Sequence, residues 1–147
     1  MPDALQRLSS ETLHASCVAI GDHAVLIEGP SGSGKSDLAL RLIDRGARLV
    51  SDDYTIIARR GDALLASAPD TIVGRIEVRG IGIVEMAACR DVEVAMLISL
   101  AEEVERMPEP GVTRLIAGVG VPVFAVRAME PSAPLKVEIA LGQLARR

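Results

Sequence analysis

The apolar positions of this chain fall mainly into short runs separated by glycine, aspartate and proline. Runs of four to eight such residues between turn-forming residues are typical of β-strands. Residues 16–20 and 24–28 are two such runs on either side of Gly21-Asp22-His23, which predicts a β-hairpin. Further extended segments are expected at residues 48–50, 54–59, 63–66, 72–86, 92–100 and 112–127.

One helix is predicted with defined ends. Leu38, Leu42 and Ile43 fall at helical spacing, and Arg45-Gly46 supplies a basic last turn and a terminal glycine, so we expect a helix at about residues 35–45. The pattern at residues 135–144 fits a helix or a strand equally well.

The remaining segments predict loops within one domain. Residues 102–111, with two prolines and four acids, are expected to form a loop. Residues 1–12 are polar and are expected to be a flexible N-terminus. The sequence shows no repeat or linker, and 147 residues suit a single domain, so residues 1–147 are expected to form one unit.

Composition narrows the function classes. Apolar residues make up 49% of the chain but aromatic residues only 1%, so the core must consist of Val, Ile, Leu and Ala. Scarce aromatics and a net charge of −4 without a basic block argue against nucleic-acid binding and a membrane-surface anchor. Cys17 and Cys89 match no metal spacing and are expected to be reduced. With no leader or apolar span recognisable, a cytoplasmic protein is expected.

The strongest chemical signal is a phosphate-binding loop. The sequence matches G-x-x-x-x-G-K-[ST] between an expected strand and an expected helix, which is the context this motif requires. Glycines let backbone N–H groups surround phosphate oxygens, and the helix N-terminus adds a positive dipole end. The expected phosphate-binding residues are Gly29, Pro30, Ser31, Gly32, Ser33, Gly34, Lys35 and Ser36.

Carboxylates elsewhere could complete a phosphoryl-transfer site. Asp52 and Asp53 follow an expected strand, where one could face a metal and the other take a proton from an acceptor hydroxyl. A solvated acidic turn is the alternative interpretation. Glu77 lies in the apolar segment 76–79, where it shares a strand face with Arg79, and a surface ion pair is the alternative there.

The order of these motifs resembles the catalytic domain of the HPr kinase/phosphorylase family. The resemblance rests on His14-Ala15, the loop at residues 29–36, Leu49-Val50-Ser51-Asp52-Asp53 and the E-[IV]-R-G-[LI]-G-I signature at residues 77–83. It implies a P-loop fold of the phosphoenolpyruvate-carboxykinase-like type, a mixed α/β fold whose β-sheet carries few helices. It also implies an ATP-dependent serine kinase acting on HPr or a paralogous phosphocarrier in the phosphotransferase system, with possible phosphorolysis by inorganic phosphate that yields pyrophosphate.

The same resemblance implies roles for individual residues. Lys35 would bind the β- and γ-phosphates, and Ser36 and Glu77 would bind Mg²⁺. Asp53 would act as the base, with Asp52 beside it near the metal and His14 close to Asp53. A homo-oligomer, hexameric in the family, is also implied.

Three departures qualify the resemblance. By comparison with the family, we expect the N-terminal domain before His14 and the C-terminal helices after Arg147 to be absent, and no G-R-N run follows Pro122-Val123. Arg127 is the candidate for the arginine of that run. These features match a short form found in α-proteobacteria, and they imply kinase activity more directly than phosphorolysis.

Two other functions stay open at this point. One is a P-loop kinase of a small metabolite, which the lack of an Arg-rich lid and of aromatic residues disfavours. The other is a nucleotide-sensing module that binds without turnover.

Overall fold

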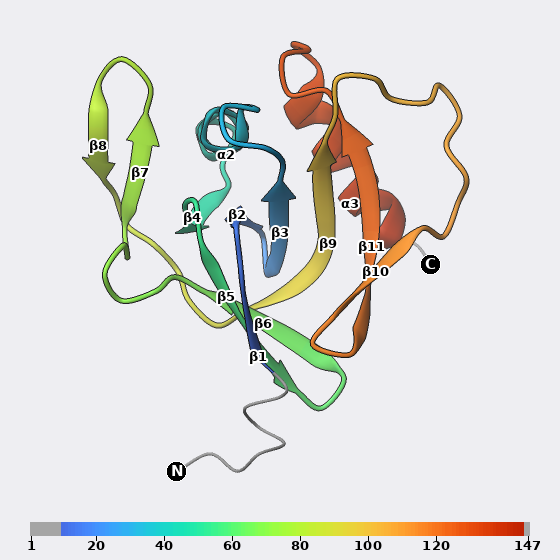
Figure 1. Ribbon diagram of the computed structural model, residues 1–147, viewed down its shortest axis with the longest axis horizontal. Coiled ribbons are helices and arrows are strands. Elements are labelled where there is room, and N and C mark those ends of the chain that lie inside the picture. The colour runs from blue at the N-terminus through green and yellow to red at the C-terminus, as the bar shows by residue number, and fades with distance from the viewer. Residues whose placement is uncertain (1–9, 146–147) are drawn as a thin grey trace.

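A strongly curled sheet forms the frame of the protein in the computed structural model, which describes residues 10–145 (Figure 1). Nine strands belong to this sheet, and two more form a separate hairpin. In chain order the elements are β1 (Ser10–Leu13), β2 (Ala15–Ile20), β3 (His23–Glu28), α2 (Lys35–Asp44), β4 (Arg48–Ser51), β5 (Thr55–Arg60), β6 (Ala63–Ser67), β7 (Arg75–Val78), β8 (Gly82–Glu85), β9 (Val92–Leu100), β10 (Thr113–Ile116), β11 (Val119–Val126) and α3 (Ala133–Leu144).

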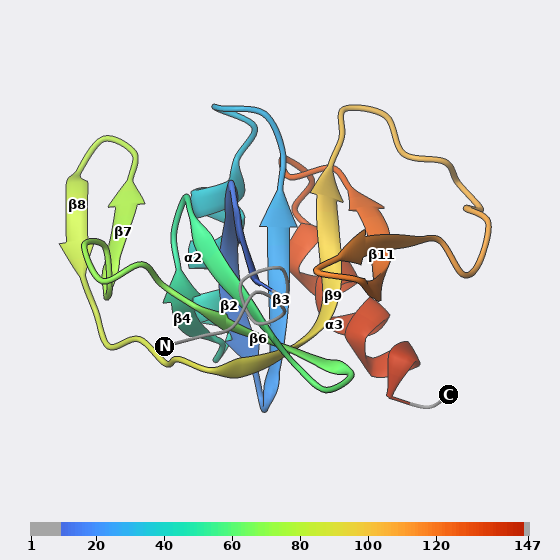
Figure 2. The same cartoon turned by 60° about the horizontal axis from the view of Figure 1, so that its bottom comes forward.

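The central layer of the sheet runs β4-β2-β3-β9-β11 (Figure 2). β2 pairs antiparallel with β3 and β4, whereas β9 pairs parallel with β3 and β11. The start of β9 also pairs with β6, which carries β5 and β1 across the other face. Because β3 and β4 both run antiparallel to the β2 strand between them, the loop after β3 and the end of β4 lie at the same edge of the sheet.

Two apolar cores lie on opposite faces of this layer. The first contains Leu38 and Leu42 of α2 and Val137 and Leu141 of α3, so both helices cover one face. The second lies beneath the curled strands; its members include Cys17, Leu26, Val50, Ile57, Leu64, Ala66 and Leu97. Both consist mainly of Val, Ile, Leu and Ala, as the composition predicted.

The predicted mixed α/β class with few helices is confirmed, and most expected strands are present within one or two residues. The first hairpin has a tighter turn than expected: Ile20 pairs with His23, so only Gly21 and Asp22 connect its strands. The undecided segment at residues 135–144 is a helix, α3, whose first turn contains Pro134, a position that tolerates proline because its N–H has no intrahelical partner.

The expectation of a flexible segment at residues 1–12 is wrong for its last three residues. Ser10 to Leu13 form β1, which pairs with β5, and the Glu11 carboxylate accepts a hydrogen bond from the Ala117 N–H. The strand was missed because its side chains are mostly exposed, so it lacks an apolar face. Residues 1–9 of that expectation lie outside the described residues. Neither α2 nor α3, the helices within residues 10–145, has the length and apolarity needed to cross a membrane.

Candidate active site

The loop at residues 29–36 connects β3 to α2 and uses its glycines for two separate reasons. Gly32 and Gly34 have φ values of 78° and 103°, a region that side-chain-bearing residues rarely adopt. At Gly29 the constraint is space, since an added Cβ would lie 2.5 Å from Ser33 Oγ and 3.0 Å from Leu100 Cβ. The motif therefore forms a tight loop directly before the N-terminus of α2.

Lys35, the first residue of α2, folds back over this loop. Its Nζ donates to the carbonyl oxygens of Gly29, at 2.7 Å, and Pro30, at 3.2 Å. The residue is 7% exposed, so its charge is fixed close to the loop. An ammonium group has three donors, which leaves one for a phosphate oxygen.

Asp52 is a buried carboxylate that accepts hydrogen bonds from residues of three different elements. Its Oδ1 accepts from Ser36 Oγ of α2 at 2.6 Å and from Ser16 Oγ of β2 at 2.8 Å. Its Oδ2 accepts from the Glu77 backbone N–H of β7 at 2.9 Å. These contacts join the phosphate-binding loop, the sheet and the hairpin at one carboxylate.

Asp53, by contrast, projects to the surface. Its φ is 69°, so the chain turns sharply after Asp52 and the two adjacent side chains enter different environments. Asp53 Oδ1 lies 2.8 Å from His14 Nε2, and the imidazole ring stacks on Tyr54 with ring centroids 4.9 Å apart. The structure thus brings together His14 and Asp53, which the sequence interpretation had paired.

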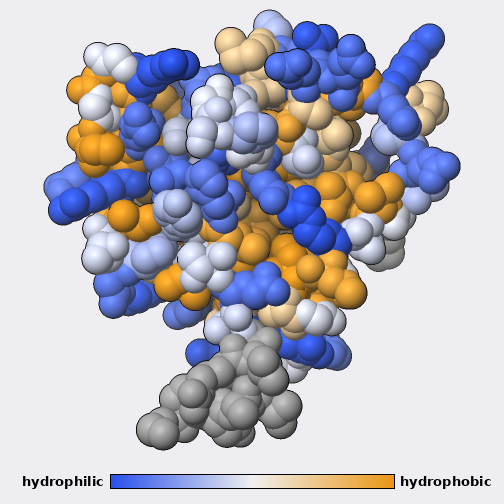
Figure 3. Space-filling view, in the orientation of Figure 1, coloured by the Kyte–Doolittle hydropathy of each residue, from blue (hydrophilic) through white to orange (hydrophobic). Residues whose placement is uncertain are grey.

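Glu77 lies on the β7–β8 hairpin, which stands apart from the curled sheet (Figure 1). Ile76 is fully buried against the first core, whereas Glu77 is exposed, so the predicted separation of the two strand faces is confirmed. Apolar side chains show on this part of the surface (Figure 3), where Ile81 and Ile83 are 78% and 65% exposed. The hairpin reaches Asp52 through the Glu77 backbone, and the Glu77 carboxylate remains exposed.

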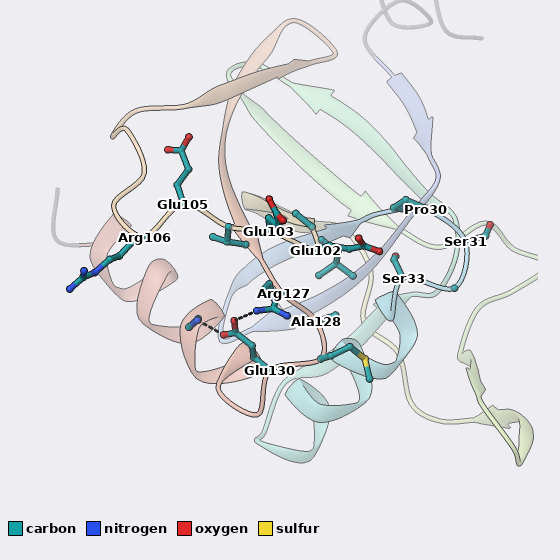
Figure 4. Close-up of a pocket in the computed structure, with 16 residues that line it drawn as sticks. Pro30, Ser31, Ser33, Glu102, Glu103, Glu105, Arg106, Arg127, Ala128 and Glu130 are labelled. Atoms are coloured by element: carbon teal, nitrogen blue, oxygen red, sulfur yellow. Dashed lines mark hydrogen bonds and ion pairs between the residues drawn. The ribbon is translucent and has the colours of Figure 1, made fainter.

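Arg127 lies on the side of the phosphate-binding loop away from the β7–β8 hairpin, in a pocket of about 1490 Å³ (Figure 4). Arg127 Nη1 is 3.7 Å from Glu130 Oε1, and Lys136 Nζ forms an ion pair with Glu130 Oε2. The Lys136 ammonium, with a smaller contribution from Arg127, holds the pKa of Glu130 below its ordinary value. The pocket wall is completed by Pro30 to Ser33 and by the acidic loop at residues 102–106.

The donors of this region fit a phosphate-rich ligand. Ser33, a residue of the pocket wall, has a buried Oγ with no hydrogen-bond partner within residues 10–145, whereas buried polar atoms are normally paired. Among the same residues no three His, Cys, Asp or Glu side chains cluster as a metal site. Mg²⁺ binds in phosphate sites through one or two protein oxygens together with phosphate and water. Ser36 and Asp52 offer such oxygens 2.6 Å apart.

Sequence reasoning missed two residues of the site. Ser16 is completely buried among apolar residues of β2, and Tyr54 stacks on His14. A polar residue within the apolar run at residues 16–20 was the available signal for Ser16. No pattern marked Tyr54, because its contact with His14 depends on the turn at Asp53.

A phosphate-binding loop between a hairpin strand and a helix, with a buried aspartate on its serine, defines a P-loop domain. Within that class, the family described as the HPr Serine kinase C-terminal domain matches residues 6–127, and the chain belongs to this family.

Relatives and a solved structure agree with this assignment. The chain is 34% identical over 136 residues to an HPr kinase/phosphorylase of Limosilactobacillus reuteri, covering 83% of this chain and 42% of the relative. It is 38% identical over 124 residues to that of Chlorobium luteolum, covering 75% and 37%. The structure of the Hpr(Ser) kinase/phosphatase from Coxiella burnetii matches with a TM-score of 0.78 and 34% identity, covering 92% of this chain and 96% of the other. The chain spans 27% to 42% of the length of the curated relatives that it matches.

Proposed function

We propose that this chain is the catalytic part of an ATP-dependent protein-serine kinase whose acceptor is an HPr-like phosphocarrier. One observation carries the proposal: the buried Asp52 accepts a hydrogen bond from Ser36 of the phosphate-binding loop, while the adjacent Asp53 is exposed and contacts His14. A site for phosphoryl transfer to a protein needs this combination, since phosphates require an enclosed cradle and a protein hydroxyl requires an accessible base.

Each residue of the site has its own role in the proposed phosphoryl transfer. The glycine-rich backbone and Lys35 bind and orient the phosphates, and Ser36 with Asp52 would hold Mg²⁺, which neutralises phosphate charge when bound. Asp53 accepts the proton of the acceptor serine as the serine oxygen bonds to the γ-phosphorus of ATP and the bond from that phosphorus to ADP breaks. His14 keeps the Asp53 carboxylate oriented through their 2.8 Å contact.

Two further assignments belong to the same proposal. Glu77 is a second metal-side carboxylate, supported by the hydrogen bond of its backbone N–H to Asp52. Arg127 contributes positive charge to the phosphates, supported by its place beside Pro30 to Ser33 in the pocket. In phosphorolysis an oxygen of inorganic phosphate would bond to the phosphorus of phosphoserine, forming pyrophosphate, and Asp53 would return a proton to the departing serine oxygen.

The proposal extends to location and assembly. Because ATP and the phosphocarriers of the phosphotransferase system are cytoplasmic, we propose that the protein acts in the cytoplasm. There it would regulate that system. The names of its relatives point to HPr as the acceptor. We also propose a homo-oligomer, to which the exposed Ile81 and Ile83 would contribute contact area; light scattering of the purified protein tests this.

The kinase proposal is tested with the purified protein, ATP, Mg²⁺ and HPr-like phosphocarriers. Mass spectrometry should detect phosphoserine on the acceptor, and Asp53→Asn should lower its formation rate by about 10²- to 10⁴-fold, the usual contribution of a general base. The matched control is Asp62→Asn, which changes an exposed turn aspartate away from the site and should leave the rate unchanged. Nucleotide binding without an acceptor, or full activity of Asp53→Asn, would refute the proposed reaction or its base.

A further inference from the structure

Ser16 is a buried hydroxyl at the centre of the site that no assignment above uses. It lies on β2 beside Cys17 and Val18, and it is 0% exposed, as they are. A hydroxyl in such a position is costly unless both its donor and its acceptor capacity are satisfied. The partners of Ser16 are the two aspartates of the proposed reaction.

The single Ser16 hydroxyl connects these aspartates. Its O–H donates to Asp52 Oδ1 at 2.8 Å, and its oxygen accepts from the Asp53 backbone N–H at 3.2 Å. A hydroxyl has a single proton. Because Ser16 donates that proton to Asp52, its oxygen has only lone pairs left and can accept the hydrogen bond from the Asp53 N–H. The hydrogen bond from the Asp53 N–H to Ser16 Oγ also stabilises the left-handed backbone conformation of Asp53. That conformation costs free energy for a residue other than glycine.

We propose that Ser16 is a positioning residue that fixes the base Asp53 relative to the metal-side carboxylate Asp52. The inference rests on the proposed function, because the two carboxylates have these roles only in a kinase. Ser36 also holds Asp52, but Ser36 belongs to the proposed phosphate-binding loop, whereas Ser16 lies on the buried strand β2. Ser16 therefore keeps Asp52 in place while Ser36 exchanges partners with the ligand.

The chain offers a matched control. Thr55 is also 0% exposed, and its hydroxyl donates to the Ala15 carbonyl at 2.8 Å. Thr55→Val thus removes a buried hydroxyl from the neighbouring strand without removing a hydrogen bond to either aspartate. A comparison of Ser16→Ala with Thr55→Val separates positioning from general loss of buried hydrogen bonds.

Two measurements test the proposal. In phosphorylation assays Ser16→Ala should lower kcat by about 10- to 100-fold, as losses of supporting hydrogen bonds around a site do, while KM for ATP changes by less than about twofold. Ser16→Thr, which restores the hydroxyl, should recover part of the rate. Nuclear magnetic resonance of the two histidines should show the His14 ring signals shifted in Ser16→Ala and unshifted in Thr55→Val, with His23 as the internal reference.

The outcomes are distinguishable. Unchanged His14 signals in folded Ser16→Ala overturn the positioning role, as does a kcat within about twofold of wild type. Equal effects of Ser16→Ala and Thr55→Val would also overturn it. The resonance measurement needs no acceptor protein, so it tests Ser16 even where the wild-type chain forms no phosphoserine, a result that would count against the proposed function alone.

Discussion

At the scale of single residues, the site depends on the opposite environments of two adjacent aspartates. Asp52 is 6% exposed and accepts hydrogen bonds from Ser16, Ser36 and the Glu77 backbone. The Asp53 side chain is 59% exposed and contacts His14. The left-handed backbone at Asp53 produces this difference. Asp52 is therefore held in one position by its hydrogen bonds, whereas Asp53 is accessible from solvent.

Gly29 provides a prediction at this scale. Gly29→Ala would place a Cβ 2.5 Å from Ser33 Oγ and 3.0 Å from Leu100 Cβ, so the loop must shift away from β9. We expect the affinity for ATP with Mg²⁺, measured by isothermal titration calorimetry, to fall at least about tenfold, equivalent to about 1.4 kcal/mol. Gly120→Ala, whose nearest neighbours are 4.0 Å away, is the control. Equal affinities of wild type and Gly29→Ala would contradict the close packing of this loop.

The residues of the site differ in how far the sequence could reveal them. Lys35 and Ser36 follow from their motif, and the resemblance paired His14 with Asp53, which lie 2.8 Å apart. The bond of Asp52 to Ser16 could not be predicted, because the position of Ser16 relative to β4 depends on the register shift where β2 pairs with β4 at Cys17 and Val18. Spacing along a chain does not fix such a register shift.

At the scale of elements, three short segments meet at Asp52, and each is held by other contacts. The hairpin base is fixed where the Met86 N–H donates to the Gly74 carbonyl at 2.8 Å. Helix α2 is tied to α3 by Arg45, whose Nη2 lies 2.8 Å from Glu138 Oε1. Arg41 of α2 also donates to the Glu130 carbonyl at 3.3 Å, which links α2 to the segment that contains Arg127 and leads into α3.

Helix α3 contains a glycine whose replacement should stabilise the protein. Gly142 lies inside the helix, and a methyl group added there would meet no atom of the described residues within 4 Å. Gly142→Ala should raise the free energy of unfolding by about 0.5–1 kcal/mol, because alanine loses less backbone entropy in a helix. Urea unfolding measures this change, with Gly111→Ala as a contrasting variant, since its φ of 78° disfavours alanine. A lower stability of Gly142→Ala would show that the helix end is not formed as described.

The hairpins were predictable from their glycine turns, but α3 was not. Its buried positions include Val137 and Leu141, which are four residues apart, as expected for a helix. Leu135 and Ile139 are 43% and 61% exposed, however, so apolar residues occur on both sides of the helix. A pattern without a polar face cannot distinguish a helix from a buried strand.

At the scale of the whole molecule, the central strands are covered on both faces. Residues of β2 alternate between the two cores: Val18 contacts the core under the helices, and Cys17 contacts the core under the curled strands. The covering of both faces places Ser16 and Cys17 completely out of solvent. Burial, together with the neighbouring Cys89, raises the pKa of the Cys17 thiol.

This raised pKa predicts a pH dependence of stability. Below about pH 8.5 the thiol is protonated in both states; at higher pH it ionises only in the unfolded chain, which favours unfolding. The free energy of unfolding should therefore fall above about pH 8.5, with a Cys17 contribution approaching 1.4 kcal/mol per pH unit. Urea unfolding under reducing conditions at several pH values should show a smaller slope in Cys17→Ala than in wild type or Cys89→Ala. Identical slopes would mean that Cys17 reaches solvent in the folded protein.

The stacking of Tyr54 on His14 has a spectroscopic consequence. The chain contains one tyrosine and no tryptophan, so nearly all of its ultraviolet fluorescence originates from that ring. The emitting group lies 4.9 Å from the imidazole that contacts Asp53, with the ring planes inclined by 21°. The fluorescence of Tyr54 is therefore an intrinsic probe of the site. A change in its emission on adding nucleotide or acceptor would report a change in the surroundings of His14 and Asp53, without any attached label.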